Sequence, residues 1–516
     1  MHPMTDSNIN TYCLPVGSVA DFVTLPVAGL DLMPANEGRT DTAPFTALDC
    51  FDQSLRRSSR LLLDTGTAFE LLTDQAPLVT QATKKRVSFV TQLADGPVRR
   101  ALDKLSALRS LLPVGSGERH RAAAVFIDDE GKTHCRVNMM QLVTEQDKAV
   151  VIELHGIKGY ADSVERLREH ISQLGGTALN CRALYEQLFA ALPAYDPKPE
   201  IFIAGDDTAF DAANKIISTH IPLLRANEFG VIADHDTEFL HDYRIHLRKI
   251  RSVLSLFKGV YDEAQTAALQ QRFSTLMAPT GTLRDLDVYL LEKQRFYDLL
   301  PEGLHIGLDT LFDLLSQRRA AEQKQLSIYL ESEQYQREIN GLAKRFTQSK
   351  GLKPGASASL SAFEYARERI WRRYRKVSRI ASGIGPHTSD VQIHELRIHC
   401  KKLRYLLEFF GPVFPKARLD KLLKALKRLQ DELGLFNDYS VQQESLSAFA
   451  LELSAQRLDA ELELEVAQSV GALIAVLHSR QIAQRARILK KIERFNRSKT
   501  QRAFKQLFQE PQEDAT

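Results

Sequence analysis

The chain is poor in the residues that build cross-links and aromatic surfaces. Its 516 residues include five cysteines and a single tryptophan. The cysteines are odd in number and widely spaced, with no C-x-x-C pair, which argues against a disulfide framework and against a structural zinc site. We expect each to be a small buried apolar residue; they are Cys13, Cys50, Cys135, Cys181 and Cys400.

Long apolar runs are missing as well. No stretch reaches the roughly 18 uninterrupted apolar residues that a membrane-spanning helix requires. The first residues, MHPMTDSNINTYCLPVG, do not place an apolar segment behind a basic one, so we expect no secretory signal. With 44% hydrophobic and 26% charged residues, the composition is typical of a soluble globular protein. We therefore expect a cytoplasmic protein with no membrane partner.

The net charge of +3 conceals an uneven distribution. Residues 1–204 contain 21 Lys and Arg against 25 Asp and Glu, whereas residues 205–516 contain 47 against 40. The second part of the chain is therefore its basic part. Because the excess is modest, the placement of the charges matters more than their total.

Secondary-structure patterns divide the chain near the same place. The first part mixes short runs rich in Val and Ile, typical of strands, with amphipathic helical stretches. The strand-like runs are 122–127 and 149–154, and the helical stretches are 163–174 and 183–192. A linker with two prolines follows at 194–200, and the rest is helical almost throughout. We predict the α+β class, with a sheet domain at 1–198 and an all-α domain at 205–510.

An internal repeat organises the helical domain. HDYRIHLRKIRSVLSLF, at 241–257, aligns with HELRIHCKKLRYLLEFF, 153 residues later, with 8 of 17 positions identical. We expect two similar helical bundles, 205–346 and 361–510, around a pseudo-two-fold axis. Gly281 and Gly434, which are 153 residues apart, are interpreted as breaks before the next helix. The same offset aligns Phe210 with Phe363, Gly281 with Gly434, Asp285 with Asp438 and Val288 with Val441.

Each copy of the repeated segment carries a basic stripe beside an apolar one. Apolar residues recur at three- and four-residue spacing, and a row of His, Arg and Lys is displaced from them by about 100° around the helix. Like charges in such a row repel each other unless an anion balances them. The row contains His241, Arg244, Arg248 and Arg251 with Lys249 beside it, and in the second copy His394, Arg397, Lys401 and Arg404 with Lys402 beside it.

Two further segments add basic residues. A solvated face is the ordinary explanation for charges on a single helix. Recurrence in both copies and the extra basic runs favour a shared groove for a polyanion. His246 and His399 lie on another side of the repeated helix, so we expect them to meet interior partners. The extra runs contain Arg369, Arg372, Arg373, Lys376 and Arg379 in one segment and Lys421, Lys424, Lys427 and Arg428 in another.

These motifs match a known pattern. H-[DE]-x-R-x-x-x-[RK]-[RK]-[LI]-R, followed downstream by L-x-x-x-x-G-x-x-[RN]-D, occurs at 241–285 and again at 394–438. The pattern resembles the CHAD domain, a conserved-histidine α-helical domain, over residues 205–505. The resemblance implies a duplicated helical bundle that binds inorganic polyphosphate through the His, Arg and Lys residues of both stripes. From the charge pattern we add the extra runs to the predicted site, apart from Lys421. Arg284 completes the motif of the first copy, where the second copy has Asn437.

Polyphosphate also suits these residues on physical grounds. It is a flexible repeating anion without base edges, so a track of Arg and Lys suits it better than a closed pocket. We predict a polyphosphate-binding protein located at polyphosphate granules. Nucleic acid is the weaker candidate partner because Trp371 and Tyr405 are isolated aromatic residues among the basic helices. A helical scaffold that binds no anion and a homodimer are left open.

The first domain carries a weaker resemblance. Residues 49–72, 118–142 and 149–175 together resemble the CYTH, or triphosphate-tunnel, domain, which implies an antiparallel barrel that binds triphosphate and a divalent metal. Active members open with an E-x-E-x-K strand that binds the metal, and residues 1–48 contain no such motif. We expect a degenerate domain without catalytic residues, metal or cofactor, which scaffolds, dimerises or binds an anion through Arg119, Arg121 and Arg136. A triphosphatase or polyphosphatase that uses Glu153 is the alternative.

Overall fold

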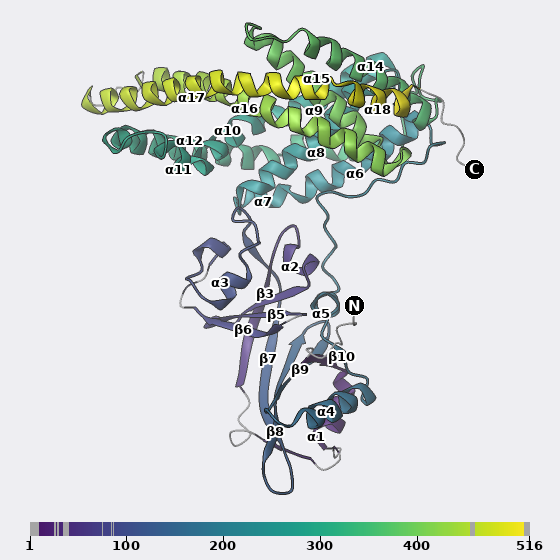
Figure 1. Cartoon of the computed structure of the whole chain (residues 1–516), viewed down its shortest axis with the longest axis vertical. Helices are drawn as coiled ribbons and strands as arrows, with labels where there is room; N and C mark the ends of the chain where they lie inside the picture. Colours follow the sequence, from purple (N-terminus) through teal and green to yellow (C-terminus); the bar gives the residue numbers. More distant parts are fainter. Residues whose placement is uncertain are drawn as a thin grey trace. The chain divides into compact units, whose positions relative to one another are not determined.

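The structure is a computed structural model, and it describes residues 10–24, 27, 30–34, 41–74, 76–83, 85, 87–454 and 460–509. The chain forms two compact units, Met1–Lys198 and Pro199–Thr516. The first unit contains a curved sheet with short helices, and the second is helical (Figure 1). The predicted order of a sheet domain and a helical domain is therefore confirmed. Within the described residues, no helix combines the length and the apolar character needed to cross a membrane.

The first unit is built on an antiparallel sheet that curves into a half-barrel. Its strand order in the described residues is β10-β1-β9-β8-β7-β3-β4-β5-β6, and β2 pairs with β7. The two predicted strand-like runs lie within β7 and β9. The strands are β1 (Thr11–Leu14), β2 (Asp31–Pro34), β3 (Asp41–Cys50), β4 (Arg60–Asp64), β5 (Ala68–Thr73), β6 (Ala76–Ala82), β7 (Leu111–Ile127), β8 (Thr133–Thr144), β9 (Lys148–Gly156) and β10 (Thr177–Ala178).

Helices pack on both faces of the sheet because alternate residues of each strand point to opposite sides. On β9, Ile152 packs into a cluster with residues of α1 and α4, whereas Val151 packs into a cluster with residues of α5. Four cysteines are buried as expected, but Cys13 is only half-buried. The helices of this unit are α1 (Val19–Thr24), α2 (Ser54–Arg57), α3 (Pro97–Ala101), α4 (Ala161–Gln173) and α5 (Cys181–Leu188).

The second unit follows the repeat found in the sequence. The apolar rows of both repeated segments are buried, from Leu240 to Phe257 and from Ile393 to Phe410. The helices are α6 (Ala209–Ala226), α7 (Glu228–Ile232), α8 (Thr237–Leu256), α9 (Glu263–Met277), α10 (Gly281–Leu291), α11 (Lys293–Tyr297), α12 (His305–Glu331), α13 (Glu333–Thr347), α14 (Ala362–Ser382), α15 (Asp390–Phe409), α16 (Lys416–Ser454), α17 (Ala460–Phe495) and α18 (Ser498–Phe508).

Helices of the two copies begin at equivalent residues. α6 and α14 begin 153 residues apart, as do α8 and α15. Their first turns are also capped alike, because the side chains of Thr208 and Ser361 accept hydrogen bonds from backbone N–H groups three residues later. In each copy the two helices pack together, α6 on α8 and α14 on α15.

The predicted helix break at Gly434 is wrong. Gly281 does begin α10, after a short 3-10 turn that contains Pro279, whereas Gly434 lies inside the continuous helix α16. Proline lacks a backbone N–H and interrupts an α-helix, and the position equivalent to Pro279 holds Glu432. The proline rather than the glycine therefore determines where the helix ends.

Candidate anion-binding site

In the helical unit, several residues of the first copy contact the residue at the equivalent position of the second copy. The rings of Phe257 and Phe410 stack with centroids 4.8 Å apart and an interplanar angle of 15°. The Tyr289 hydroxyl donates a hydrogen bond to the Gln442 carbonyl at 3.3 Å. Thr208 and Ser361 form an isolated antiparallel bridge. Each of these pairs is separated by 153 residues, so the repeat is also a spatial relation between the copies.

The basic stripes of the two copies come together in the same way. α8 packs against α15, and Arg248 of α8 interacts electrostatically with its equivalent Lys401 of α15. Arg244 also interacts with charged residues of the first copy, and Lys401 with charged residues of the second. We call this set the central cluster; it consists of Arg244, Arg248, Arg251, Arg284, Arg397, Lys401 and Arg404.

Burial and charge repulsion lower the pKa of two members of the central cluster. Lys401 is half-buried, and its burial together with the neighbouring arginines lowers its pKa to about 8. Burial also lowers the pKa of Arg244, and its arginine neighbours act in the same direction. Asp285 and Asp438 oppose these shifts without cancelling them. Neighbouring cations destabilise the charged form of such a group, and an anion that binds next to it stabilises that form again.

Hydrogen bonds and an ion pair hold several basic side chains in and near the cluster. Arg244 donates to the Thr280 hydroxyl at 2.5 Å, and Arg404 lies 3.4 Å from Glu408. In the second copy, His394 Nδ1 lies 2.6 Å from Asn437 Oδ1, so the residue that replaces arginine in the motif holds the histidine. These contacts orient the side chains before any ligand arrives, which reduces the entropy lost on binding.

The second pair of repeated histidines faces the interior, as predicted. His246 lies 3.1 Å from His220, and the equivalent contact in the second copy joins His399 to Arg373 at 2.7 Å. Burial lowers the pKa of His220 to about 2, and those of His246 and His399 to about 4. These rings are therefore neutral near pH 7 and serve as structural contacts rather than as charges for an anion.

A second basic group lies beside the first. Burial and the nearby charges of Arg373, Lys376 and Lys258 lower the pKa of Lys402. Lys258 lies just beyond the repeated segment and was not among the predicted residues. Lys376 is 3.8 Å from Glu395, so an acid partly balances this group. It therefore extends the basic surface rather than forming its centre.

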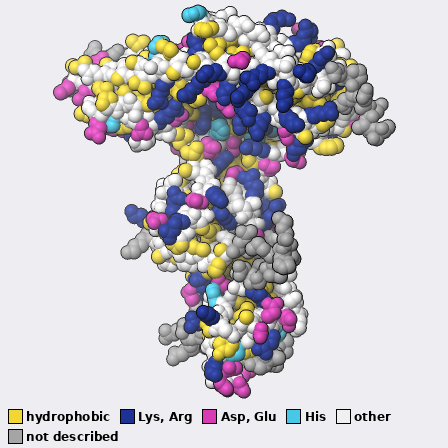
Figure 2. Space-filling model, in the orientation of Figure 1, with side chains coloured by type: hydrophobic (Ala, Val, Ile, Leu, Met, Phe, Trp, Pro, Cys, Tyr) yellow, Lys and Arg dark blue, Asp and Glu magenta, His cyan; other side chains and the backbone are white. Residues whose placement is uncertain are grey.

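Other predicted residues point to different places. Arg369 donates to the Lys258 carbonyl at 3.0 Å and lies over the Tyr365 ring. Arg379 lines a groove with Trp371 between α14 and α18, and Arg428 lines another between α16, α17 and α18. Figure 2 shows Lys and Arg side chains spread over one face of the helical unit. Arg372, Lys424 and Lys427 are exposed.

The arginines of the first unit are paired with carboxylates instead. Arg119 lies 2.8 Å from Asp41 and 3.5 Å from Glu70, and Arg121 lies 2.9 Å from Glu70. Arg119 and Glu70 are both buried. Their charges are satisfied within the unit, which argues against the predicted anion site at Arg119 and Arg121, whereas Arg136 is exposed. The sequence pattern gave no signal for Glu70 as their shared partner.

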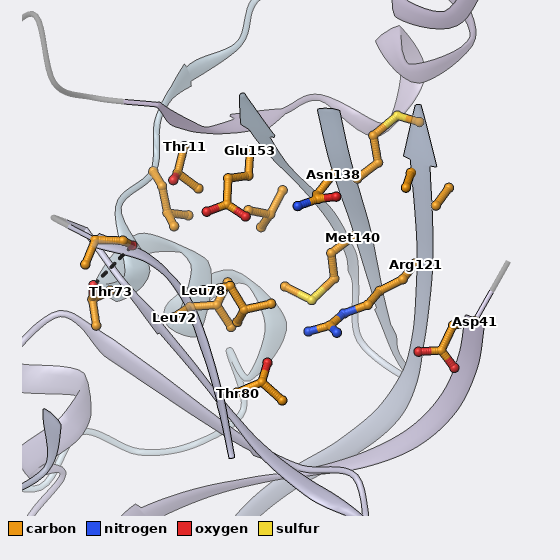
Figure 3. Close-up of a pocket in the computed structure, with 16 residues that line it drawn as sticks. Thr11, Asp41, Leu72, Thr73, Leu78, Thr80, Arg121, Asn138, Met140 and Glu153 are labelled. Atoms are coloured by element: carbon orange, nitrogen blue, oxygen red, sulfur yellow. Dashed lines mark hydrogen bonds between the residues drawn. The ribbon is translucent and has the colours of Figure 1, made fainter. Parts of the chain in front are cut away.

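Arg121 also lines a cavity on the concave side of the sheet (Figure 3). Glu153 points into this cavity, and its Oε2 lies 3.2 Å from His155 Nε2. Across the described residues, no group of three or more His, Cys, Asp or Glu could hold a metal ion. The cavity therefore offers two carboxylates, Asp41 and Glu153, and an arginine that is paired with Glu70.

Comparisons with known proteins agree with the helical part of the sequence analysis. Residues 215–447 match the family model of the CHAD domain, so the predicted CHAD domain is confirmed there. An uncharacterized protein of Mycobacterium tuberculosis, Rv2226, is 24% identical over 244 residues, which are 47% of this chain and 46% of the relative. The chain thus spans about half the length of the curated relative that it matches.

Two solved structures are similar to the chain. The crystal structure of the CHAD domain from the plant Ricinus communis has 25% identity and a TM-score of 0.46, covering 57% of this chain and 95% of that one. PptA from Streptomyces chartreusis has 13% identity and a TM-score of 0.42, covering 56% and 99%. The resemblance of residues 1–198 to the CYTH domain stays a prediction.

Proposed function

We propose that the helical unit binds inorganic polyphosphate across the central cluster. The observation that carries this proposal is the packing of α8 on α15, which brings the equivalent residues Arg248 and Lys401 within electrostatic range of each other, with further arginines on both helices. Seven cations interact there with three carboxylates, Asp285, Asp438 and Glu408. A polyanion that spans α8 and α15 relieves the repulsion and supplies the missing charge.

The form of the site favours a repeating anion over a compact one. Apart from Arg284 of α10, the basic side chains come from two helices and follow each helix for about two turns, from Arg244 to Arg251 and from Arg397 to Arg404. Consecutive phosphates of a flexible chain meet such a row one after another. The aromatic ring beside the cluster is Tyr405, which lies next to Arg404. A single ring offers little stacking for the bases of a nucleic acid.

We also propose that the two copies are related by an approximate two-fold axis. A residue touches its own equivalent only where such an axis passes close to it. Three contacts support this relation: Thr208 with Ser361, Phe257 with Phe410, and Tyr289 with Gln442. The electrostatic interaction of Arg248 with Lys401 agrees with them. The polyphosphate chain then crosses the axis between α8 and α15 and meets similar groups on both sides.

For the first unit we propose a degenerate tunnel-like domain without catalytic activity. The inward positions of β8 and β9 support this, because they read Leu142, Met140 and Asn138 on one strand and Ala149, Val151 and Glu153 on the other. A lumen for triphosphate needs cations on most of its walls. We further propose a cytoplasmic location at polyphosphate granules, where the helical unit holds the polymer.

A titration of the full chain with long-chain polyphosphate tests the proposal. We expect saturable binding that weakens as salt rises, because the polyanion releases counterions when it binds. The variant Arg248→Gln plus Lys401→Gln removes the central charges with little change in size. Each lost charge-assisted contact contributes about 1.5 kcal/mol, so the affinity falls roughly 100-fold.

The matched control removes two charges outside the central cluster. Lys344→Gln plus Arg345→Gln on α13 lowers the net charge by the same amount and changes the affinity by less than about threefold. Equal losses in the two double variants contradict the assignment of the site. Absence of binding by the unchanged protein contradicts the proposed function itself.

A further inference from the structure

The cavity of the first unit is a second, chemically different place for a ligand. It measures about 360 Å³ and opens on the concave side of the sheet (Figure 3). That volume lies within the usual range for small-molecule pockets. Its apolar wall comes from strands on both arms of the half-barrel and includes Leu72, Leu78, Met140, Val151 and Leu179.

Polar groups gather at one end of this cavity. Thr11, Glu153 and Asn138 are neighbours on β1, β9 and β8, because Thr11 and Asn138 are the two register partners of Glu153. Figure 3 shows the Glu153 carboxylate between them, with Leu72 and Leu78 below it. Asn138 Nδ2 lies 3.2 Å from His155 Nε2, which leaves Asn138 Oδ1 as an acceptor. The strand register therefore places three oxygen acceptors side by side.

One oxygen of Glu153 has no hydrogen-bond partner among the residues that the structure describes. Glu153 is 9% exposed, and its Oε1 is buried without a donor in reach. A buried acceptor without a donor costs about 1 to 3 kcal/mol, so a site that leaves one unpaired gains by taking up an N–H group. The other oxygen, Oε2, lies 3.2 Å from His155 Nε2, which accepts from Asn138 Nδ2 and so has no proton to donate to the carboxylate.

The remaining charges exclude the anionic and metallic ligands. Arg121 is held 2.9 Å from the buried carboxylate of Glu70, so its charge is already matched and a phosphate would have to break that pair. A calcium or magnesium ion needs about six oxygen ligands, and the cavity supplies only two carboxylates among leucine and methionine side chains, of which Asp41 is already paired with Arg119. A nitrogen cation requires fewer acceptors and tolerates an apolar wall.

We infer that this cavity binds a small organic cation with an ammonium head and a short hydrocarbon body. The three N–H groups of a primary ammonium donate to Glu153 Oε1, Asn138 Oδ1 and the Thr11 hydroxyl. The body lies against Leu78 and Val151, where each buried methylene adds to the affinity. The inference is independent of polyphosphate binding, because it concerns residues of the other unit.

Calorimetric titration of the full chain with hexylammonium chloride, in the absence of polyphosphate, tests the inference. We expect one-to-one saturable binding, and weaker binding of hexanol, which has the same body without the charge. Glu153→Gln keeps the shape of the side chain and removes its charge, so hexylammonium binds at least about tenfold more weakly. Glu145→Gln, at an exposed position of the β8–β9 turn, leaves the affinity unchanged.

A second variant keeps the carboxylate and fills the space. Leu78→Trp on the edge strand β6 occupies the cavity from the wall opposite Glu153, so it abolishes hexylammonium binding while the unliganded melting temperature shows that the unit is folded. Equal hexylammonium affinity in Glu153→Gln and the unchanged protein overturns the inference. Hexanol that binds as tightly as hexylammonium also overturns it, as does tripolyphosphate binding that Leu78→Trp removes.

Discussion

The two units of the chain place arginine in opposite surroundings. In the sheet unit, Arg119 and Arg121 each meet the buried carboxylate of Glu70, and Arg119 also meets Asp41. In the helical unit, Arg248 meets Lys401, and the neighbouring residues are mostly cations as well. The first arrangement balances its own charge, whereas the second leaves an excess of positive charge, which the proposed polyanion would balance.

This contrast shows why a count of basic residues is a poor guide to anion binding. A buried arginine with its own carboxylate contributes to folding and has no charge left for a ligand. Cations that lower each other's pKa hold free energy that an anion can release. The predictions below compare the two kinds of arginine directly.

Charge reversal in the helical unit produces the largest effect. Arg244→Glu plus Arg397→Glu places one acid on each side of the central cluster. Each reversal costs about 2 kcal/mol of binding free energy, so the affinity for polyphosphate falls roughly 1,000-fold in a calorimetric titration. Lys344→Glu plus Arg345→Glu is the control on α13, and a similar loss there shows that general attraction, not the cluster, holds the polymer.

Removal of a paired arginine in the sheet unit produces the next largest effect, and on stability instead of binding. Arg119→Met leaves the buried Glu70 with one cation fewer and lowers the free energy of unfolding of this unit by about 3 kcal/mol. Denaturant unfolding measures it. The polyphosphate affinity stays as it was; a marked loss of affinity makes the sheet unit part of the anion site.

The pH dependence of binding produces a smaller effect, which Lys401 controls. With a pKa of about 8, this ammonium loses its proton as the pH rises from 7 to 9. Bound polyphosphate favours the protonated form and raises that pKa, so the affinity falls with rising pH, by about tenfold at pH 9. Arginine stays charged throughout, so Lys401→Arg flattens the profile. If the affinity of Lys401→Arg falls with rising pH as steeply as that of the unchanged protein, another group is responsible for the pH dependence.

The smallest effect concerns the stability of the helical unit without ligand. Arg248→Met removes one member of a repelling pair, so we expect the free energy of unfolding to rise by about 0.5 kcal/mol at low salt. The gain disappears at high salt, where the repulsion is screened. A loss of stability at low salt means that Arg248 has a carboxylate partner comparable to Glu70 in the sheet unit.

The sequence was a good guide to the helical unit because its signals are periodic and repeated. The apolar rows of 241–257 and 394–410 predicted the buried faces of α8 and α15, and the interior position of His246 and His399 followed from the same spacing. The offset of 153 residues predicted related copies. It did not reveal that Arg248 would lie beside Lys401, because spacing along a helix does not specify which helix packs on which.

The sheet unit was harder to predict for a physical reason. Its charge balance depends on Glu70 of β5 reaching Arg119 and Arg121 of β7, which lie far away in the sequence. The curvature of the sheet creates this contact, and no local pattern encodes it. The continuous helix through Gly434 was missed because glycine alone is a weak helix breaker, whereas Pro279 in the first copy is a strong one.

A crystal structure of the full chain with bound tripolyphosphate tests the central claim most directly. The account predicts phosphate oxygens within hydrogen-bond distance of both Arg248 and Lys401, between α8 and α15. Phosphate groups that instead occupy the groove beside Trp371 and Arg502, with no anion between α8 and α15, contradict it.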